Sequence, residues 1–157
     1  MKRTAQLALL AATLAGISQA GASDEPPPAA TLVIVVGAGS AVNDIARTDL
    51  KRVFLGEPIG SLVPFNMTPS ATERTVFERL ALGMSGDEVG RYWVDRKIRG
   101  QGQAPRTLPT PLHVQKVVAK FPGAISYVTA DKLTSELKAL KVDGKAYTDA
   151  GYPLTMH

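Results

Sequence analysis

The chain has no cysteine among its 157 residues and only two histidines, His113 and His157. The lack of cysteine excludes disulfides and a cysteine-anchored lipoprotein, and it removes thiolates as nucleophiles or metal ligands. No Ser/His/Asp or Cys/His set, carboxylate pair or metal-ligand cluster stands out around the two isolated histidines. We therefore expect no catalytic residue, no metal site and no cofactor, and the sequence does not indicate an enzyme.

Long apolar runs are also scarce. The run from Ala5 to Ile17 is too short to span a bilayer, and no second one follows it. It lies between the basic start Met1-Lys2-Arg3 and the small residues Ser18 to Ala22. This arrangement predicts a signal peptide over residues 1–22 and an exported protein, most simply in a bacterial periplasm.

The sequence has little net charge. Its 18 basic and 14 acidic residues give a formal charge of +4, and removing Lys2 and Arg3 with the signal peptide leaves 18 − 2 = 16 against 14, or +2. An excess this small does not indicate a nucleic-acid partner. It is compatible with a small anionic ligand but does not require one.

The mature chain divides into a linker and one domain. Residues 23–30 contain three prolines and predict a flexible or extended linker, which leaves 31–157 as a single domain. The β-branched run Thr31 to Val36 predicts a central strand that is covered on both faces. Further strands are predicted at 62–65 and 124–128, while 132–141 is either helix or strand. Helices are predicted at 49–55 (with Thr48 as N-cap), at 72–82, from Ser85 to about Ile98 (with Ser85 and Glu88 as a capping box) and at 111–120 (with Pro111 at its first position). Residues 142–145 predict a hairpin or tight turn. This alternation predicts an α/β sandwich with a mainly parallel sheet.

The segment from Asn66 to Arg74 is the strongest candidate for a binding site. Ser70 is placed to cap the following helix, and Glu73, three residues later, completes a capping box. A helix N-terminus presents unpaired N–H groups and partial positive charge, and nearby hydroxyl groups add donors. The segment therefore predicts a site for a small oxyanion, with the alternative that Ser70 and Glu73 only cap a helix. On that helix, we expect four charged side chains to face solvent: Glu73, Arg74, Glu78 and Arg79.

Two other segments favour structural roles. Gly37-Ala38-Gly39-Ser40 partly matches a dinucleotide-binding turn, but Val42 stands where the pattern needs a third glycine, and Asn43 and Asp44 interrupt the helix. We expect a plain loop there. A basic group surrounds the loop from Arg99 to Pro109, either as a rim near an anion or as a solvated face, and the solvated face is favoured. This group consists of Arg91, Arg96, Lys97, Arg99 and Arg106.

Five stretches, in their order along the chain, resemble one lobe of the phosphate-type periplasmic substrate-binding proteins. They are Val33 to Val36, Thr48 to Gly56, Val63 to Phe77, Pro122 to Val128, and Val142-Asp143-Gly144 with Gly151 to Leu154. Together they span most of the mature chain. The resemblance implies a single type II periplasmic-binding-protein-like lobe, in contrast to the two lobes of the receptors.

The resemblance also implies which residues contact the ligand. The family's Ser-Gly-Thr triplet aligns with Ser70-Ala71-Thr72, its arginine with Asn66 and its aspartate with Thr68. Asn66 lacks the bidentate charged donor that arginine supplies, which Arg74 could partly replace. Because Thr68 stands where the family has its aspartate, the resemblance implies weak selectivity for phosphate over sulfate.

Two functions follow from this interpretation. The first is an exported, single-lobe protein that binds phosphate or another small oxyanion through Asn66, Thr68, Ser70, Ala71, Thr72 and Arg74. Its partner would be the membrane component of an ABC transporter or another periplasmic protein. The alternative is a periplasmic accessory or protein-interaction module that kept the lobe and lost the ligand. The sequence leaves the ligand's identity and the oligomeric state open.

Overall fold

The computed structural model describes residues 31–156. The predicted signal peptide (1–22) and linker (23–30) lie outside the described residues, as does His157. Within residues 31–156, no helix is long and apolar enough to cross a membrane.

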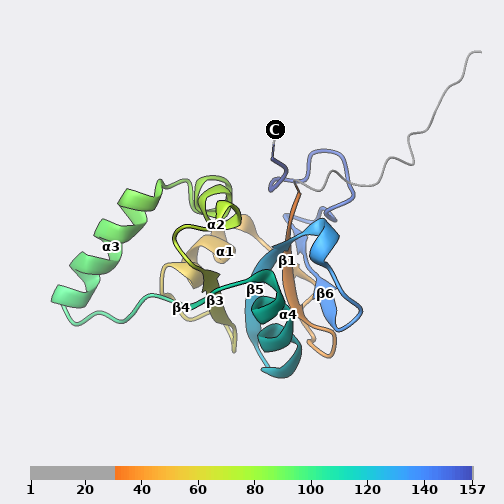
Figure 1. Cartoon of the computed structure of the whole chain (residues 1–157), viewed down its shortest axis with the longest axis horizontal. Helices are drawn as coiled ribbons and strands as arrows, with labels where there is room; N and C mark the ends of the chain where they lie inside the picture. The colour runs from red at the N-terminus through yellow and green to blue at the C-terminus, as the bar shows by residue number, and fades with distance from the viewer. Residues whose placement is uncertain (1–30, 157) are drawn as a thin grey trace, which may run out of the picture.

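Within these described residues, five strands form the central sheet in the order β4-β3-β5-β1-β6 (Figure 1). Their bounds are β1 Leu32–Gly37, β3 Val63–Met67, β4 Arg106–Leu108, β5 Ala124–Thr129 and β6 Leu137–Ala139. Strand β3 is parallel to β4 and β5, whereas β1 is antiparallel to both β5 and β6. Among the described strands of this sheet, β1 therefore runs antiparallel, and the other strands all run in one direction. The predicted α/β fold with a mainly parallel central sheet is confirmed.

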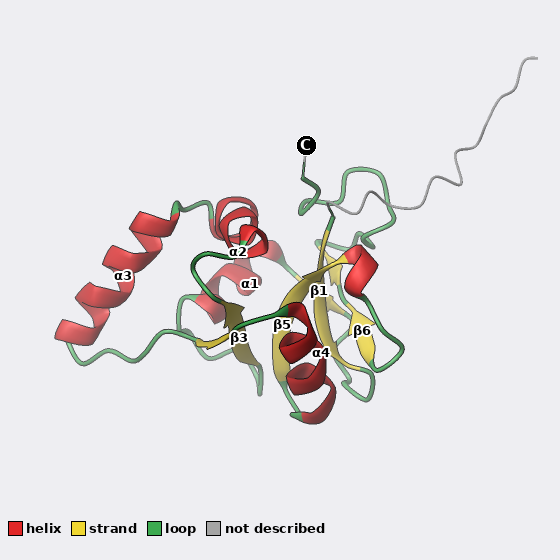
Figure 2. Ribbon diagram, in the orientation of Figure 1, coloured by secondary structure: helices red, strands yellow, loops and turns green. Residues whose placement is uncertain are grey.

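Strand β1 is the centre of the core. Its residues Leu32 to Val36 are at most 1% exposed, as expected for an aliphatic strand between two others with both faces covered. Helix α4 (Pro111–Lys120) lies in front of the sheet in Figure 2, and Pro111 occupies its first turn as predicted. The Thr110 hydroxyl accepts a hydrogen bond from the N–H of His113 at 3.3 Å.

An aromatic cluster joins β5 to the helices on the other side of the sheet. Phe54 ends α1 (Arg47–Phe54), and Phe77 ends α2 (Thr72–Phe77). The Phe77 ring stacks on Tyr127 of β5 at a centroid distance of 4.2 Å and lies 4.6 Å from the Phe54 ring. Because these side chains are buried, the C-terminal ends of both helices are fixed against the sheet.

Helix α1 begins two residues earlier than predicted, so Thr48 is not its N-cap. The N-cap is Ala46, whose side chain cannot accept a hydrogen bond. Instead, the carboxylate of Asp143 accepts the N–H of Arg47 at 2.8 Å. The cap therefore comes from a turn 96 residues away in sequence.

Helix α3 (Gly86–Ile98) reaches away from the sheet at one end of the molecule (Figure 1). The predicted capping box is present, since Ser85 accepts from Glu88 N at 3.2 Å and Glu88 accepts from Ser85 N at 2.7 Å. The hydrogen bond from the Ser85 backbone lowers the pKa of the Glu88 carboxyl. Toward the body of the protein, the Tyr92 hydroxyl donates to the carbonyl of Leu55 at 2.7 Å.

The sequence left residues 132–141 as either helix or strand, and the structure of the C-terminal region decides between the two. The short η2 (Ala130–Lys132) ends at Lys132, and after a turn the chain forms strand β6, so the strand alternative is the one observed. Strand β7 (Lys141–Val142) pairs in parallel with β2 (Asp44–Ile45). The predicted tight turn at 142–145 is confirmed, because Val142 and Lys145 exchange backbone hydrogen bonds of 2.9 and 3.0 Å.

Candidate functional site

The turn from Thr68 to Ala71 connects the end of β3 to the start of α2. The N–H of Ala71 donates to the carbonyl of Thr68 at 2.9 Å, which closes a four-residue turn with Pro69 at its second position, where proline is favoured. Ala71, in extended conformation, is the N-cap, and no side chain caps the helix. The predicted Ser70–Glu73 capping box is therefore wrong, because the turn places Ser70 one residue before the cap.

Several donors at this helix start have no partner in the described part of the chain. The first backbone hydrogen bond of the helix runs from Thr75 N to Ala71 O at 3.2 Å. The N–H groups of Thr72, Glu73 and Arg74 therefore precede the helical ladder. The side chains of Ser70 and Thr72 are exposed beside them, and within residues 31–156 neither hydroxyl makes a hydrogen bond. The sequence prediction placed Ala71 among the anion-binding residues. In the structure its N–H already donates to the carbonyl of Thr68 and is not open to a ligand.

Asn66 lies inside β3 and not in the turn, and it is 5% exposed. Its side-chain oxygen accepts a hydrogen bond from the hydroxyl of Tyr127 and another from Met67 N at 3.0 Å. Burial raises the pKa of Tyr127 well above the ordinary value, so the phenol stays protonated and can donate. The Asn66 oxygen is thus used inside the protein, whereas the amide NH₂ makes no hydrogen bond with residues 31–156.

Arg74 forms an ion pair with Glu78 instead of facing solvent freely. Its Nε lies 2.7 Å from the Glu78 carboxylate, and its Nη1 donates to the carbonyl of Met67 at 2.9 Å. Glu78 is 2% exposed, so the prediction that it faces outward is wrong. The helix changes at this residue to a π-helical segment, η1 (Glu78–Leu82), which alters the α-helical periodicity on which that prediction depended.

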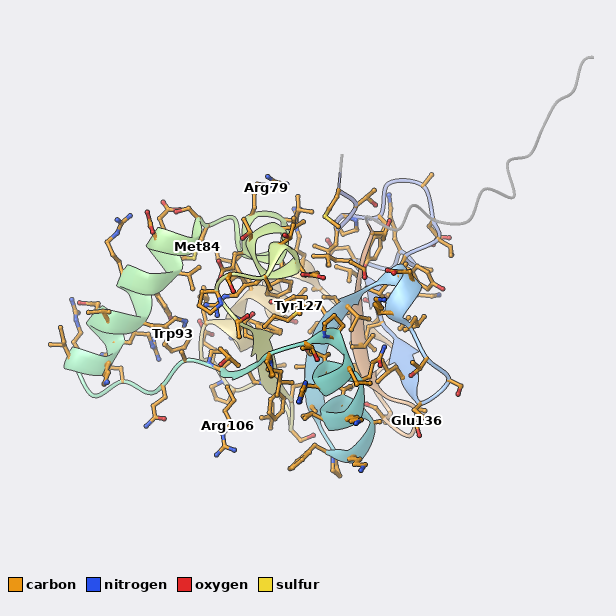
Figure 3. All side chains as sticks on the ribbon, viewed as in Figure 1. Arg79, Met84, Trp93, Arg106, Tyr127 and Glu136 are labelled. Carbon is orange, nitrogen blue, oxygen red and sulfur yellow. The ribbon has the colours of Figure 1, made fainter. Side chains whose placement is uncertain are left out.

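The basic group around the loop 99–109 does not gather at the turn. Arg106 pairs with Phe65, the middle residue of β3, in the parallel ladder, and its side chain projects outward (Figure 3). The Arg96 guanidinium lies over the rings of Tyr92 and Trp93, 5.5 and 5.8 Å from their centroids. Arg99 pairs with Asp95 at 3.1 Å, and both side chains are more than half exposed. The Arg99–Asp95 pair fits the solvated-face interpretation, whereas Arg96 packs on the aromatic rings and donates to the carbonyl of Gln101 at 2.7 Å.

Other features give weaker candidates. A groove of about 550 Å³ lies at the start of β3, where Val63, Phe65, Arg106 and Phe121 contribute to its lining. The loop at 37–40 leads into β2 and not directly into a helix, so it lacks the strand–turn–helix geometry of a dinucleotide site.

Among the described residues, no three His, Cys, Asp or Glu side chains gather in a way that could hold a metal ion.

Sequence reasoning missed two contacts that shape the site. The burial of Glu78 had one sequence signal, its position four residues after Arg74, which is the spacing of a helical ion pair. The bond between Tyr127 and Asn66 joins residues 61 positions apart. No local pattern predicts that contact, because it depends on β5 packing beside β3.

Comparisons with known proteins identify the fold. The chain matches no protein-family model and no curated protein sequence. Its structure is similar to an ABC-type phosphate transport receptor from Vibrio cholerae, with a TM-score of 0.58, 15% identity, and coverage of 75% of this chain and 48% of that one. It is also similar to a putative phosphate ABC transporter substrate-binding protein with bound phosphate from Clostridium perfringens (TM-score 0.61, 15% identity, coverage 74% and 46%). A third similar structure is PstS from Borrelia burgdorferi (TM-score 0.53, 13% identity, coverage 73% and 48%).

The chain shares the fold of phosphate transport receptors. The predicted resemblance is confirmed at the level of the fold. The chain spans less than half the length of these receptors, in keeping with the expected single-lobe relative.

Proposed function

We propose that this protein is an exported, single-lobe solute-binding protein that binds phosphate or another small oxyanion at the turn from Thr68 to Arg74. The observation that carries the proposal is the set of open donors at the start of α2. Three successive N–H groups, at Thr72, Glu73 and Arg74, are free of partners within residues 31–156, and the hydroxyls of Ser70 and Thr72 lie next to them. Backbone N–H groups at a helix start, with the helix dipole behind them, favour negative charge.

Two residues at the end of β3 assist in this proposal. The amide NH₂ of Asn66 supplies a neutral donor from the strand, and Thr68 supplies a hydroxyl in the place of the family's aspartate. Neither carries charge, so discrimination between phosphate and sulfate is weak. Arg74 contributes little direct attraction in the wild-type protein because Glu78 neutralises its guanidinium at 2.7 Å.

The size of the protein sets the expected affinity. A two-lobed receptor surrounds its ligand, whereas one lobe makes about half the contacts and leaves the ligand in water. We therefore expect a dissociation constant of roughly a millimolar, which corresponds to about 4 kcal/mol of binding free energy. The partner in this proposal is the membrane component of an ABC transporter or another periplasmic protein.

A second candidate function is an accessory module that kept the lobe and lost the ligand. The observation in its favour is the Arg74–Glu78 pair, because the only charged donor in the proposed anion set is bonded within the chain. This alternative predicts a folded protein with no response to oxyanions.

Calorimetric titration separates the two functions. The mature chain is titrated with phosphate, sulfate and acetate, alongside the Ser70→Ala plus Thr72→Val variant. The proposal expects saturable phosphate binding that the double variant weakens at least tenfold. The matched control is Thr75→Val, one residue into the ladder, which should bind as the wild type does. If the folded wild-type protein gives no heat at tens of millimolar phosphate, the accessory function replaces the proposal.

A further inference from the structure

Helix α3 exposes an apolar face that no other part of residues 31–156 covers. Val89 is buried on its inner side, and Trp93 packs toward the body of the protein (Figure 3). On the outer side, Val94 is 59% exposed and Ile98 is 81% exposed. Because the helix projects at one end of the molecule (Figure 1), this face is accessible to another protein without obstruction from the sheet.

The same face carries large apolar side chains at one end, Val94 and Ile98, and glycines at the other, Gly86 and Gly90. A hollow of about 560 Å³ runs along it, and its lining includes Gly86, Gly90, Val94 and Ile98, which are spaced four residues apart. Glycine in the middle of a helix lowers helix stability. A side-chain Cβ at Gly90 would meet nothing within 4 Å, so packing inside the chain gives no reason for a glycine there.

Charges on the outer face alternate in sign at the same spacing. The order is Asp87, Arg91, Asp95 and Arg99, or minus, plus, minus, plus. When such a row is read in the opposite direction, every charge meets its opposite. The face is therefore complementary to itself in an antiparallel arrangement, both in charge and in the match of large to small residues.

We propose that the outer face of α3 binds the same face of a second copy of this chain. The two helices run antiparallel across a two-fold axis, so that each contact occurs twice. Ile98 of each copy fills the hollow at Gly90 of the other, and Arg91 of each faces Asp95 of the other. The surface Arg99–Asp95 pair within one chain is exposed and does not prevent this exchange. One helix face is a small interface, so the dimer is weak and depends on protein concentration.

Sedimentation velocity from low micromolar to millimolar protein tests the dimer. The wild-type mature chain should shift toward a dimer as concentration rises. In Gly90→Leu the added Cβ meets nothing within 4 Å and leucine favours the helix, so this variant should remain folded but monomeric. Ile98→Asp should weaken association at least tenfold, whereas Leu112→Asp, at a leucine on α4 that is 53% exposed, should not. A wild-type chain that stays monomeric throughout this range overturns the proposal.

A charge exchange tests the register. Arg91→Asp and Asp95→Arg each bring like charges together in a homodimer, so each variant alone should be monomeric. Their equimolar mixture should dimerise, because both pairs then have opposite signs. A dimer that forms equally well in all of these samples, or a mixture that stays monomeric while the wild type dimerises, contradicts the antiparallel α3 contact.

Discussion

Glu78 is the residue that determines the charge at the turn. It is buried, and its carboxylate holds the Arg74 guanidinium at the end of β3. A buried carboxylate without its partner is costly, so each member of the pair constrains the other. Asn66 in β3 has no charge, and the guanidinium of Arg74 is already bonded to Glu78 and to the carbonyl of Met67. The proposed site thus depends on neutral donors and the helix dipole.

The variant Glu78→Gln should strengthen oxyanion binding. Glutamine keeps an oxygen that accepts the hydrogen bond from Arg74 but removes the negative charge, which leaves the guanidinium net positive beside the turn. A charge-assisted contact is stronger than a neutral one, so we expect phosphate affinity to rise about tenfold, or about 1.4 kcal/mol. Calorimetry measures the change.

The double variant Arg74→Gln plus Glu78→Gln is the control for this prediction. It should lose the gain, because no guanidinium remains. An equal gain in both variants would mean that Glu78 acts only as a remote negative charge and that Arg74 is not near the ligand.

At the scale of the element, the two expected capping boxes had different outcomes. Ser70–Glu73 and Ser85–Glu88 share one sequence pattern, yet only the second forms. In the first, the Thr68–Ala71 turn starts the helix one residue later than the pattern indicates. The capping-box pattern alone does not distinguish the two, because the Thr68–Ala71 turn, with Pro69 at its second position, moves the cap from Ser70 to Ala71.

The start of α1 is stabilised from a distant turn, and substitution of Asp143 tests this contact. Asp143→Ala removes the acceptor for Arg47 N and places alanine at a φ of 52°, so it should lower the free energy of unfolding by about 1–2 kcal/mol. Asp143→Asn keeps an acceptor and tolerates this backbone conformation, so its loss should be smaller. Urea unfolding measures both, with Glu136→Ala as an exposed acidic control. A loss in Asp143→Ala no larger than in that control would show that the contact does not stabilise α1.

At the scale of the whole molecule, the sequence predicted the architecture better than the site. The aliphatic run at 32–36, the Pro111 helix start and the alternation of elements gave the α/β fold, because burial and helix caps leave strong local patterns. The orientation of Asn66 had no local sequence signal, and that of Glu78 had only its spacing of four residues from Arg74. They depend on Tyr127 from a distant strand and on a π-helical turn, and neither has a reliable local signal.

The chain corresponds to less than half of the receptors that share its fold. A single lobe exposes its helix termini to water, so any ligand bound there is exchanged quickly and held weakly. The proposed α3 dimer joins two copies at a helix separate from the turn. Each copy should therefore keep one independent oxyanion site in either oligomeric state.

The most direct test of oxyanion binding is a phosphate titration of residues 23–157, followed by the backbone amide resonances in two-dimensional nuclear magnetic resonance spectra. The N–H groups of Thr72, Glu73 and Arg74 should show the largest shifts and should saturate together at millimolar phosphate. The amide of Ala71, which is bonded to Thr68, should move less. Unchanged spectra at tens of millimolar phosphate, or saturating shifts confined to another part of the protein, would contradict the proposed site.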